Sequence, residues 1–340
     1  MKTDDTAFKS FRVSERQEGE KSFYRGDIVQ RRVGELPAGD VLIRVRYSSL
    51  NYKDALSATG NKGVTRQYPH TPGIDAAGEV VTSAVSQFNP GDKVLVTGYD
   101  LGMNTDGGFA DFIRVPAAWV VPLPSGLTLR QSMVLGTAGF TAALCVYKLL
   151  QNGLKPDNGE VLVTGATGGV GIIAVALLAR LGYAVTACTG KSEQESYLKS
   201  MGAAAVIDRA VISEPSARPL LKERWAGAVD VAGGEILWNV LRSLQYGASV
   251  ACCGLVGSPT LNATVFPFIL RGINLLGVDS VNQPAELRSA LWELLATSWK
   301  PACLDDIATD IGLAELEEGL QTVLKGRAVG RMVLDLSRPA

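Results

Sequence analysis

The sequence contains a single histidine, His70, among its 340 residues. This scarcity excludes a zinc site built on two histidines, and any Ser-His-Asp triad would have to use His70. His70 stands in "YPHTPG", between two prolines, and that context predicts a loop residue. The single histidine therefore removes much of the chemistry that depends on several histidines.

Other features are equally scarce. The five cysteines follow no regular framework, which is typical of reduced thiols and predicts a cytoplasmic protein. The formal net charge is −1 with no long run of one sign, which disfavours nucleic acid as the main partner. No apolar run reaches the roughly 18 residues of a membrane span, since Arg180 interrupts the best candidate. The acidic start "MKTDDTAFKSF" has no signal-peptide core, so we expect no membrane partner.

The pattern of the sequence changes near residue 128. Before it, short alternating segments such as "DVLIRVRYSSL" and "GDKVLVTG" predict β-strands. After it, strand-like and helix-like segments alternate, which indicates a parallel sheet covered on both faces. The end of the chain, with two amphipathic helices and the strand "GRMVLDL", leaves this repeat and could rejoin the first part. We predict an α/β protein divided into residues 1–127, 128–282 and 283–340.

The stretch "EVLVTGATGGVGIIAVALLARLG" sets Gly165, Gly168 and Gly171 between a strand and a helix. Glycines there allow a tight turn, let backbone N–H groups approach a pyrophosphate and permit close helix–strand packing. The spacing is GxxGxxG rather than GxGxxG, so the prediction depends on the flanking strands and helix. We expect a Rossmann-type doubly wound domain; a turn that binds nothing is the alternative. The predicted dinucleotide contacts in this turn are Thr167, Gly168, Gly169 and Val170.

The end of the second strand indicates which dinucleotide binds. NAD sites usually carry an Asp or Glu there for the ribose hydroxyls, whereas this chain has "TGKS". A cation and hydroxyls suit the 2′-phosphate of NADPH, which a carboxylate would repel. The alternative for Lys191 is an ordinary solvated lysine. We predict NADPH as the cofactor, with contacts from Thr189, Gly190, Lys191, Ser192 and Tyr197.

Longer stretches resemble the medium-chain dehydrogenase/reductase superfamily over nearly the whole chain. The matching pieces are "NYKD", "PGIDAAGEV", "GDKVLV", "GGFADF", "GTAGFTA" and "TGATGGVG". Members of that superfamily combine a nucleotide-binding domain with a GroES-like β-barrel catalytic domain completed by the C-terminal part. The resemblance implies this barrel for residues 1–127 with 283–340, and a homodimer paired through the edge strand "RGINLLGV".

Within the superfamily, the chain resembles the zinc-free side. The zinc enzymes carry a ligand cysteine near Asn51–Asp54 and Gly-His-Glu near Gly73–Asp75, and this sequence has neither. The pieces "NYKDAL", "YLKSMGA", "WAGAVD", "FPFILRGINLLGVDSV" and "GRAVGRMVLD" are similar to the subgroup of quinone oxidoreductases and acryloyl-CoA reductases. The resemblance implies NADPH-dependent reduction of a C=C bond conjugated to a carbonyl. Hydride adds to the β-carbon, hydrogen-bond donors stabilise the enolate, and the α-carbon is then protonated.

The motif "NYKD" supplies the catalytic candidates. Tyr52 has a phenol that donates a proton more readily than it accepts one at neutral pH, and its ring can equally pack against the cofactor. Asn51 and Asp54 are further catalytic candidates, with shaping of the loop as the alternative. Asp75 stands where the zinc enzymes have a ligand, and we expect it to make structural hydrogen bonds.

Strand and helix ends suggest further cofactor contacts. Ligands bind at the carboxyl ends of parallel strands, which indicates Gly254 and Leu255 after "ACC" and Ser280 in "GVDSV". Adjacent Cys252 and Cys253 point to opposite faces of a strand, so we expect buried thiols rather than a metal pair. The alternatives are core packing for the threonines in "GTAGFTA" and surface charge for the arginines in "GRAVGR". Thr137 and Thr141 are expected at a helix start beside the nicotinamide. The remaining predicted contacts are Arg218 and Arg331.

Three functional interpretations remain. The leading one is an NADPH-dependent reductase of an enone or enoyl-CoA, most specifically of acryloyl-CoA to propionyl-CoA. A quinone reductase shares every motif named above. A non-catalytic NADPH-binding redox sensor is the interpretation of a different class, although a bare binding module would not need "NYKD" and "GGFAD".

Overall fold

A computed structural model describes residues 3–19 and 21–338. The chain divides into two compact units. Unit 1 comprises Met1–Thr137, Val281–Ala296 and Leu304–Ala340, and unit 2 comprises Ala138–Ser280 and Thr297–Cys303. The sequence predicted a boundary after residue 127, whereas in the structure the first unit continues to Thr137.

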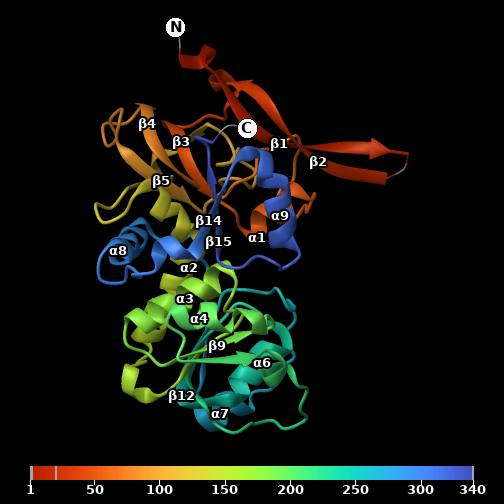
Figure 1. The fold of residues 1–340 in the computed structure, drawn as a ribbon, viewed down its shortest axis with the longest axis vertical. Helices are drawn as coiled ribbons and strands as arrows, with labels where there is room; N and C mark the ends of the chain where they lie inside the picture. The colour runs from red at the N-terminus through yellow and green to blue at the C-terminus, as the bar shows by residue number, and fades with distance from the viewer. Residues whose placement is uncertain (1–2, 20, 339–340) are drawn as a thin grey trace. The chain divides into compact units, whose positions relative to one another are not determined.

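Unit 2 is built on a parallel sheet in the order β10-β9-β8-β11-β12-β13. Figure 1 labels two of its strands, β9 and β12. Strands β9 and β10 are added on one side of β8, and β11, β12 and β13 on the other. The order of successive strands therefore reverses between β8 and β11, which is the switch point of a doubly wound fold. Ligands of such folds bind outside the carboxyl ends of the strands. The parallel sheet predicted from the sequence is confirmed. Its strands are β8 (Val161–Val163), β9 (Val185–Thr189), β10 (Ala205–Asp208), β11 (Trp225–Asp230), β12 (Leu244–Cys252) and β13 (Asn274–Gly277).

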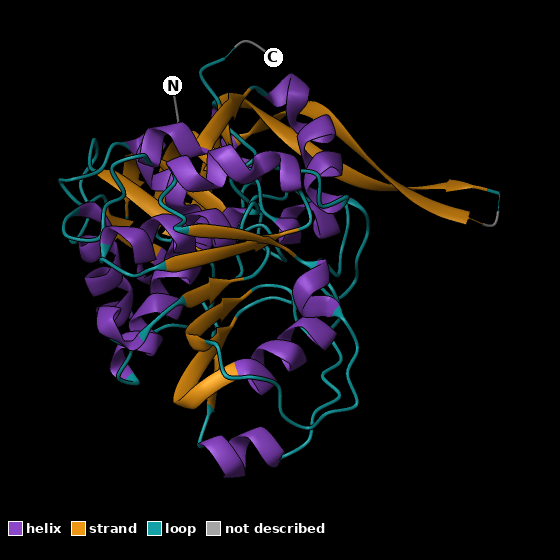
Figure 2. Ribbon diagram, turned by 60° about the horizontal axis from the view of Figure 1, so that its bottom comes forward, coloured by secondary structure: helices purple, strands orange, loops and turns teal. Residues whose placement is uncertain are grey.

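Helices connect the strands of unit 2 and cover its sheet (Figure 2). Because such crossovers are right-handed, the helices of the two halves lie on opposite faces. Residues Gly171 to Leu178 of α3 are all buried, which explains why this helix is apolar around its whole circumference. Leu237 and Trp238 of α6 pack into one core cluster with Trp225 of β11. The helices are α3 (Gly169–Arg180), α4 (Glu195–Ser200), α5 (Ala210–Ser213), α6 (Gly234–Ser243) and α7 (Phe266–Arg271).

Unit 1 contains a mostly antiparallel sheet in the order β14-β15-β3-β4-β5-β7, with β6 also paired to β3. The inward-facing residues Val41, Ile43 and Val45 alternate along β3 and form its core with neighbouring strands. Because β15 pairs with β3, the C-terminal segment joins a sheet that begins near the N-terminus. The strands are β3 (Val41–Ser49), β4 (Asp75–Ser83), β5 (Lys93–Thr97), β6 (Phe112–Val115), β7 (Val120–Pro122), β14 (Ala308–Ile311) and β15 (Arg331–Asp335).

A long antiparallel ribbon of unit 1 projects from this sheet in both ribbon views (Figures 1 and 2). At its base, Val13 exchanges two backbone hydrogen bonds with His70. His70 is buried outside the regular elements, as predicted, with Nε2 2.9 Å from Gly102 O, and burial lowers its pKa. The other elements of unit 1 are β1 (Ala7–Glu18), β2 (Lys21–Arg32), α1 (Tyr52–Ala58), α8 (Ala285–Ala296) and α9 (Leu316–Leu324).

Helix α2 (Leu129–Gln151) is the one helix among the described residues that is long and apolar enough to cross a membrane. However, 78% of its most apolar window is buried within the protein, and a core helix passes the same test of length and composition. The apolar run that Arg180 interrupts forms the shorter helix α3.

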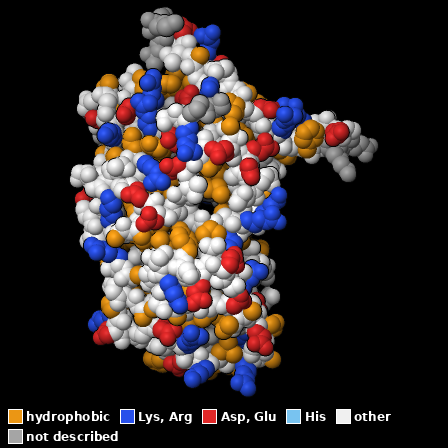
Figure 3. Space-filling view, in the orientation of Figure 1, with side chains coloured by type: hydrophobic (Ala, Val, Ile, Leu, Met, Phe, Trp, Pro, Cys, Tyr) orange, Lys and Arg blue, Asp and Glu red, His pale blue; other side chains and the backbone are white. Residues whose placement is uncertain are grey.

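Charged side chains of both signs are interspersed on the face shown in Figure 3. No broad area of that face carries one sign, in keeping with the formal net charge of −1. Nucleic-acid-binding proteins usually present a stripe or patch of positive charge. The visible face offers no such surface.

Candidate active site

Helix α1 begins directly after Asn51, and the carboxylate of Asp54 fixes that start. Asp54 Oδ2 accepts a hydrogen bond from the Asn51 backbone N–H at 2.8 Å, as in a capping box. Asp54 Oδ1 accepts from the backbone N–H groups of Gly73, at 3.1 Å, and Ile74, at 2.8 Å. Asp54 is fully buried; burial, and then the charge of Asp75, raise its pKa to about 7. This side chain therefore ties the helix start to the segment that enters β4.

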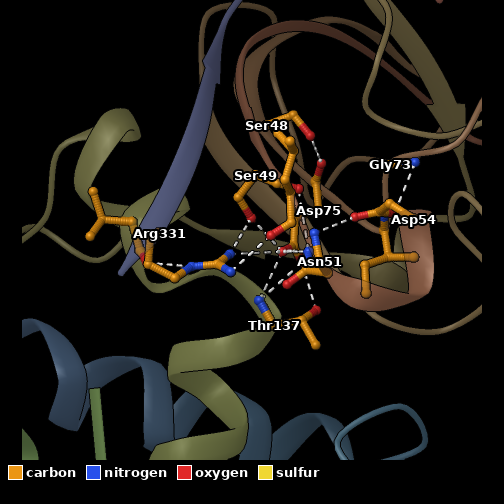
Figure 4. A network of polar contacts seen from close by, with 11 residues as sticks. Ser48, Ser49, Asn51, Asp54, Gly73, Asp75, Thr137 and Arg331 are labelled. Atoms are coloured by element: carbon orange, nitrogen blue, oxygen red, sulfur yellow. Dashed lines mark hydrogen bonds and ion pairs between the residues drawn. The ribbon is translucent and has the colours of Figure 1, made fainter. Parts of the chain in front are cut away.

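Asp75, the first residue of β4, is the centre of a buried polar network (Figure 4). Its carboxylate accepts hydrogen bonds from Ser49 Oγ at 2.6 Å and Asn51 Nδ2 at 2.8 Å. It also accepts from the Thr137 N–H, 3.0 Å from both oxygens, and from the Thr137 hydroxyl at 2.6 Å. Hydrogen bonds to a charged group contribute about 1.5–3 kcal/mol each, so this network is a strong local constraint. The structural role expected for Asp75 is confirmed.

Gly136 allows α2 to break beside this network. Its φ of 52° and ψ of −156° are non-helical, and a positive φ favours glycine. A Cβ at this position would lie 2.5 Å from Asp75 Oδ2 and 2.6 Å from Ser49 Oγ. The break starts a new helical segment at Thr137, and Asp75 supplies the negative charge that a helix N-terminus attracts. The helix start expected at Thr137 agrees with this break.

Strand β15 brings Arg331 into the same network. The guanidinium donates to Val134 O at 3.1 Å, Leu50 O at 2.9 Å and Ser49 Oγ at 2.8 Å. Its Nη2 lies 4.0 Å from Asp75 Oδ2, and the residue is only 4% exposed. The surface position considered for Arg331 is therefore wrong. The geometry also gives no support to the predicted cofactor contact, because every guanidinium nitrogen already has a partner in unit 1.

The three catalytic candidates occupy different environments. Tyr52 is 38% exposed, and no residue that the structure describes hydrogen-bonds to its hydroxyl. The side-chain amide of Asn51 donates hydrogen bonds to Asp75 Oδ2 and Ser49 O. The Asp54 carboxylate accepts hydrogen bonds from backbone N–H groups. The geometry favours loop shaping for Asn51 and Asp54. Tyr52 is the most exposed of the three, and its role as a proton donor stays a prediction.

Two members of the network, Ser49 and Gly136, were not singled out from the sequence. Gly136 opens the motif "GTAGFTA", and a glycine immediately before an expected helix start is a signal that could have identified it. The contact of Ser49 with Asp75 depends on the pairing of β3 with β4. No local pattern reports such a contact.

The donor set of this site does not fit zinc. Within residues 3–19 and 21–338, no three His, Cys, Asp or Glu side chains gather as a metal-binding group. Asp54 and Asp75, which stand near the ligand positions of the zinc enzymes, accept hydrogen bonds that a cation would have to displace. We derive no step through a metal ion.

In unit 2, β8 leads into the predicted glycine-rich turn. Gly165 has φ 56°, and a Cβ at Gly171 would lie 2.3 Å from Gly165 O, so both positions require glycine. Helix α3 follows with Gly168 as its N-cap. The first N–H groups of a helix lack intrahelical partners and attract anions. The turn therefore fits a pyrophosphate.

Two cations border the carboxyl end of β9. Lys191 is half-buried, which lowers its pKa, and its backbone N–H donates to Thr189 Oγ1 at 3.1 Å. Arg209, which no sequence motif indicated, directly follows the neighbouring strand β10. A Cβ at Gly190 would lie only 2.7 Å from Arg209 Nε. An arginine and a lysine beside one strand end suit a phosphate group.

The other predicted cofactor contacts lie at several places in unit 2, where their roles stay predictions. Thr167 is buried, with Oγ1 3.2 Å from Thr189 Oγ1. Arg218 is exposed on the segment between α5 and β11. The remaining contacts lie on the glycine-rich turn and α3 (Gly169, Val170), near α4 (Ser192, Tyr197), on α2 (Thr141), after β12 (Gly254, Leu255) and after β13 (Ser280).

The prediction that the thiols of Cys252 and Cys253 are buried is wrong in part. Both side chains are half-buried, because β12 ends at Cys252 and Cys253 already belongs to the following loop. Cys145 and Cys188 are the buried thiols, and burial raises the pKa of Cys188 to about 12.

Two family models match the chain. One is the alcohol dehydrogenase GroES-like domain, over residues 37–125, and the other is the zinc-binding dehydrogenase, over residues 169–297. Acrylyl-CoA reductase AcuI of Ruegeria pomeroyi is 48% identical over 303 residues, which cover 89% of this chain and 92% of that protein. Putative quinone oxidoreductase YhfP of Bacillus subtilis shows the same identity and coverage.

Solved structures agree with these matches. Crystalline YhfP with NAD bound has a TM-score of 0.94 at 44% identity, covering 98% of this chain and 100% of that one. Escherichia coli YhdH with NADPH bound has a TM-score of 0.91 at 43% identity, covering 96% and 99%. The predicted combination of a Rossmann-type and a GroES-like domain is confirmed. The chain therefore belongs to the medium-chain dehydrogenase/reductase family of oxidoreductases.

Proposed function

We propose that this oxidoreductase uses NADPH to reduce the C=C bond of acryloyl-CoA, forming propionyl-CoA. The observation that supports this cofactor is the presence of two cations at the end of β9. Lys191 directly follows Gly190 in the chain, and Arg209 Nε lies 2.7 Å from where a Cβ of Gly190 would be. A carboxylate for the ribose hydroxyls of NAD is absent from "TGKS", the end of β9. The NADPH in YhdH supports this cofactor, whereas YhfP holds NAD, so the relatives include both.

The thioester substrate is supported by the relative AcuI, whose name gives acrylyl-CoA reductase. The equally similar YhfP is named a putative quinone oxidoreductase, which keeps a quinone as the second candidate. Both reactions place a hydride on a conjugated system and leave negative charge on an oxygen. A hydrogen-bond donor aimed at that oxygen is therefore useful in either case.

When bound, NADPH supplies the hydride for the β-carbon of the substrate. The glycine-rich turn and the N-terminus of α3 hold the pyrophosphate, and Lys191 and Arg209 hold the 2′-phosphate. The Tyr52 hydroxyl donates the proton that the α-carbon receives. Asp54 and Asp75 keep the start of α1 in place and so orient Tyr52.

Steady-state oxidation of NADPH tests the proposal, with acryloyl-CoA and a simple quinone at matched low concentrations. We expect kcat/KM above about 10⁴ M⁻¹s⁻¹ for acryloyl-CoA, within the usual range for a true substrate, and a far lower value for the quinone. The reverse ranking would establish a quinone reductase. NADPH binding without turnover of either compound would favour a redox sensor.

We further propose that two copies of the chain pair through β13. This strand is one of the two edges of the parallel sheet, and Leu275 on it is 37% exposed. Ile269 and Leu270 of the adjacent α7 are 69% and 55% exposed. An apolar edge strand left uncovered invites aggregation, so a symmetric partner is the expected cover.

Light scattering should give a dimer mass for the wild type at micromolar concentration. Leu275→Lys should shift the protein to monomer without loss of secondary structure, because a charge on an edge strand opposes pairing. A monomeric wild type, or a Leu275→Lys variant that remains a dimer, would contradict pairing through β13.

A further inference from the structure

Asp230, at the carboxyl end of β11, connects loops that follow three neighbouring strands. It has no exposed surface. Its Oδ1 accepts a hydrogen bond from Thr164 Oγ1 at 2.7 Å, and its Oδ2 accepts from the Gly233 N–H at 2.8 Å. Its backbone carbonyl accepts from the Cys253 N–H at 2.9 Å. These partners stand just after β8, β11 and β12.

Thr164 passes this constraint to the glycine-rich turn. It lies between the end of β8 and Gly165. While its hydroxyl donates to Asp230, the same oxygen accepts the Val231 N–H at 3.0 Å. Its backbone N–H donates to Val229 O at 3.0 Å. Hydrogen bonds with β11 and the loop after it therefore fix Thr164, the residue directly before the glycine-rich turn.

The loops that Asp230 joins are packed without spare room. A Cβ at Gly165 would lie 2.4 Å from Val231 Cγ2, and one at Gly254 would lie 2.2 Å from Val231 O. A Cβ at Gly233 would lie 2.5 Å from Ser258 O. A displacement of Val231 would therefore be transmitted to the loops on both sides.

We propose that Asp230 is a positioning residue for cofactor binding, which sets the glycine-rich turn through Thr164 and aligns with it the loops after β11 and β12. The inference rests on the proposed function, because these strand ends are where a doubly wound sheet receives its dinucleotide. Asp230 itself is enclosed and acts only through its partners. Loss of this alignment should weaken binding of the cofactor more than it slows the reaction of a saturated enzyme.

Thr164→Val is the sharpest test, because valine keeps the shape of the side chain and removes the hydroxyl. Thr186→Val is its matched control. Thr186 is also buried in the sheet, near the amino end of β9, and its hydroxyl donates to Glu160 Oε2 at 3.0 Å. Thr164→Val removes the two hydrogen bonds of its hydroxyl, and Thr186→Val removes one from the same sheet. Only Thr164 adjoins the turn.

We expect Thr164→Val to raise the KM and the Kd for NADPH about tenfold or more, with kcat within about twofold of the wild type. Thr186→Val should leave the KM and the Kd for NADPH within about twofold of the wild-type values, even if the two variants lower Tm equally. Equal effects of the two variants on KM, or a fall in kcat with unchanged KM, would overturn the positioning role.

Asp230→Asn and Asp230→Ala add a graded comparison. Asparagine keeps the shape of the Asp230 side chain, and its amide oxygen can still accept the Gly233 N–H. We expect the Kd for NADPH to rise from wild type to Asp230→Asn to Asp230→Ala. Asp230→Asn combined with Thr164→Val should show less than the product of the single effects, because the two residues share a bond. Effects of the two substitutions on the Kd for NADPH that simply multiply in the double variant would contradict the inference. So would an Asp230→Ala variant that fails to fold while Thr164→Val binds NADPH as tightly as the wild type.

Measuring Kd by NADPH fluorescence separates this inference from the proposed function. A wild type that binds NADPH but reduces neither substrate would contradict the proposed reaction, while the ratio of Kd values would still test Asp230. A wild type that does not bind NADPH would overturn both.

Discussion

Replacing Lys191 by glutamate is expected to raise the KM for NADPH at least about 100-fold and to change the KM for NADH less than about threefold. The substitution removes one favourable interaction with the 2′-phosphate and adds a repulsive one. Each is worth about 1–4 kcal/mol at 4 Å, depending on the local dielectric. NADH lacks this phosphate, so the loss should be confined to NADPH. Measuring the KM for NADPH and for NADH at two salt concentrations checks that the effect is electrostatic, since salt screens exposed charges.

Lys199→Glu is the matched control for this charge reversal. Lys199 lies on α4 of the same unit, is exposed and pairs with Glu195 at 2.7 Å. Its reversal should leave the KM for NADPH within about threefold. Arg209→Gln should act in the same direction as Lys191→Glu but less strongly, because it removes a charge without adding the opposite one. An equal loss of NADPH and NADH in Lys191→Glu would contradict the phosphate assignment.

Tyr52→Phe is expected to lower kcat about 100-fold while leaving the KM for NADPH within about twofold. A positioned acid contributes about 10²–10⁴-fold to a rate, and phenylalanine removes the hydroxyl but keeps the ring. The partial exposure of Tyr52 makes its hydroxyl the accessible donor next to the buried Asp54 and Asp75. Steady-state rates at saturating NADPH and substrate provide the measurement.

Two further variants separate the possible roles of Tyr52. Tyr52→Ala should also raise the KM for NADPH if the ring packs against the cofactor. Tyr246→Phe removes the hydroxyl of a tyrosine that is 77% exposed in unit 2, and it should leave kcat unchanged. Unchanged turnover of Tyr52→Phe would show that proton donation comes from another group.

Local sequence patterns were sufficient for the nucleotide-binding features. The strand before Gly165, the glycines of the turn and the apolar helix after it are consecutive in the chain, so their geometry follows from short-range sterics and hydrogen bonding. The residues "TGKS" directly follow the next strand, and their placement at its end required only that β9 be recognised. The same short range explains why Thr137 could be expected at a helix start.

Contacts between distant segments were decided only by the tertiary structure. Arg331 comes from a strand near the C-terminus, and only the pairing of β15 with β3 places it against Ser49, where it is buried rather than free for a cofactor. Arg209 reaches Gly190 because β10 lies beside β9.

The sequence by itself determined the fold class, the glycine-rich turn and the charge expected at the phosphate, since each depends on neighbouring residues. Only the tertiary structure decided that Asp54 and Asp75 are enclosed hydrogen-bond acceptors while Tyr52 remains accessible. Burial and hydrogen-bond partners depend on which strands pair and which loops pack together. These long-range contacts are set by the whole core, and no single motif encodes them.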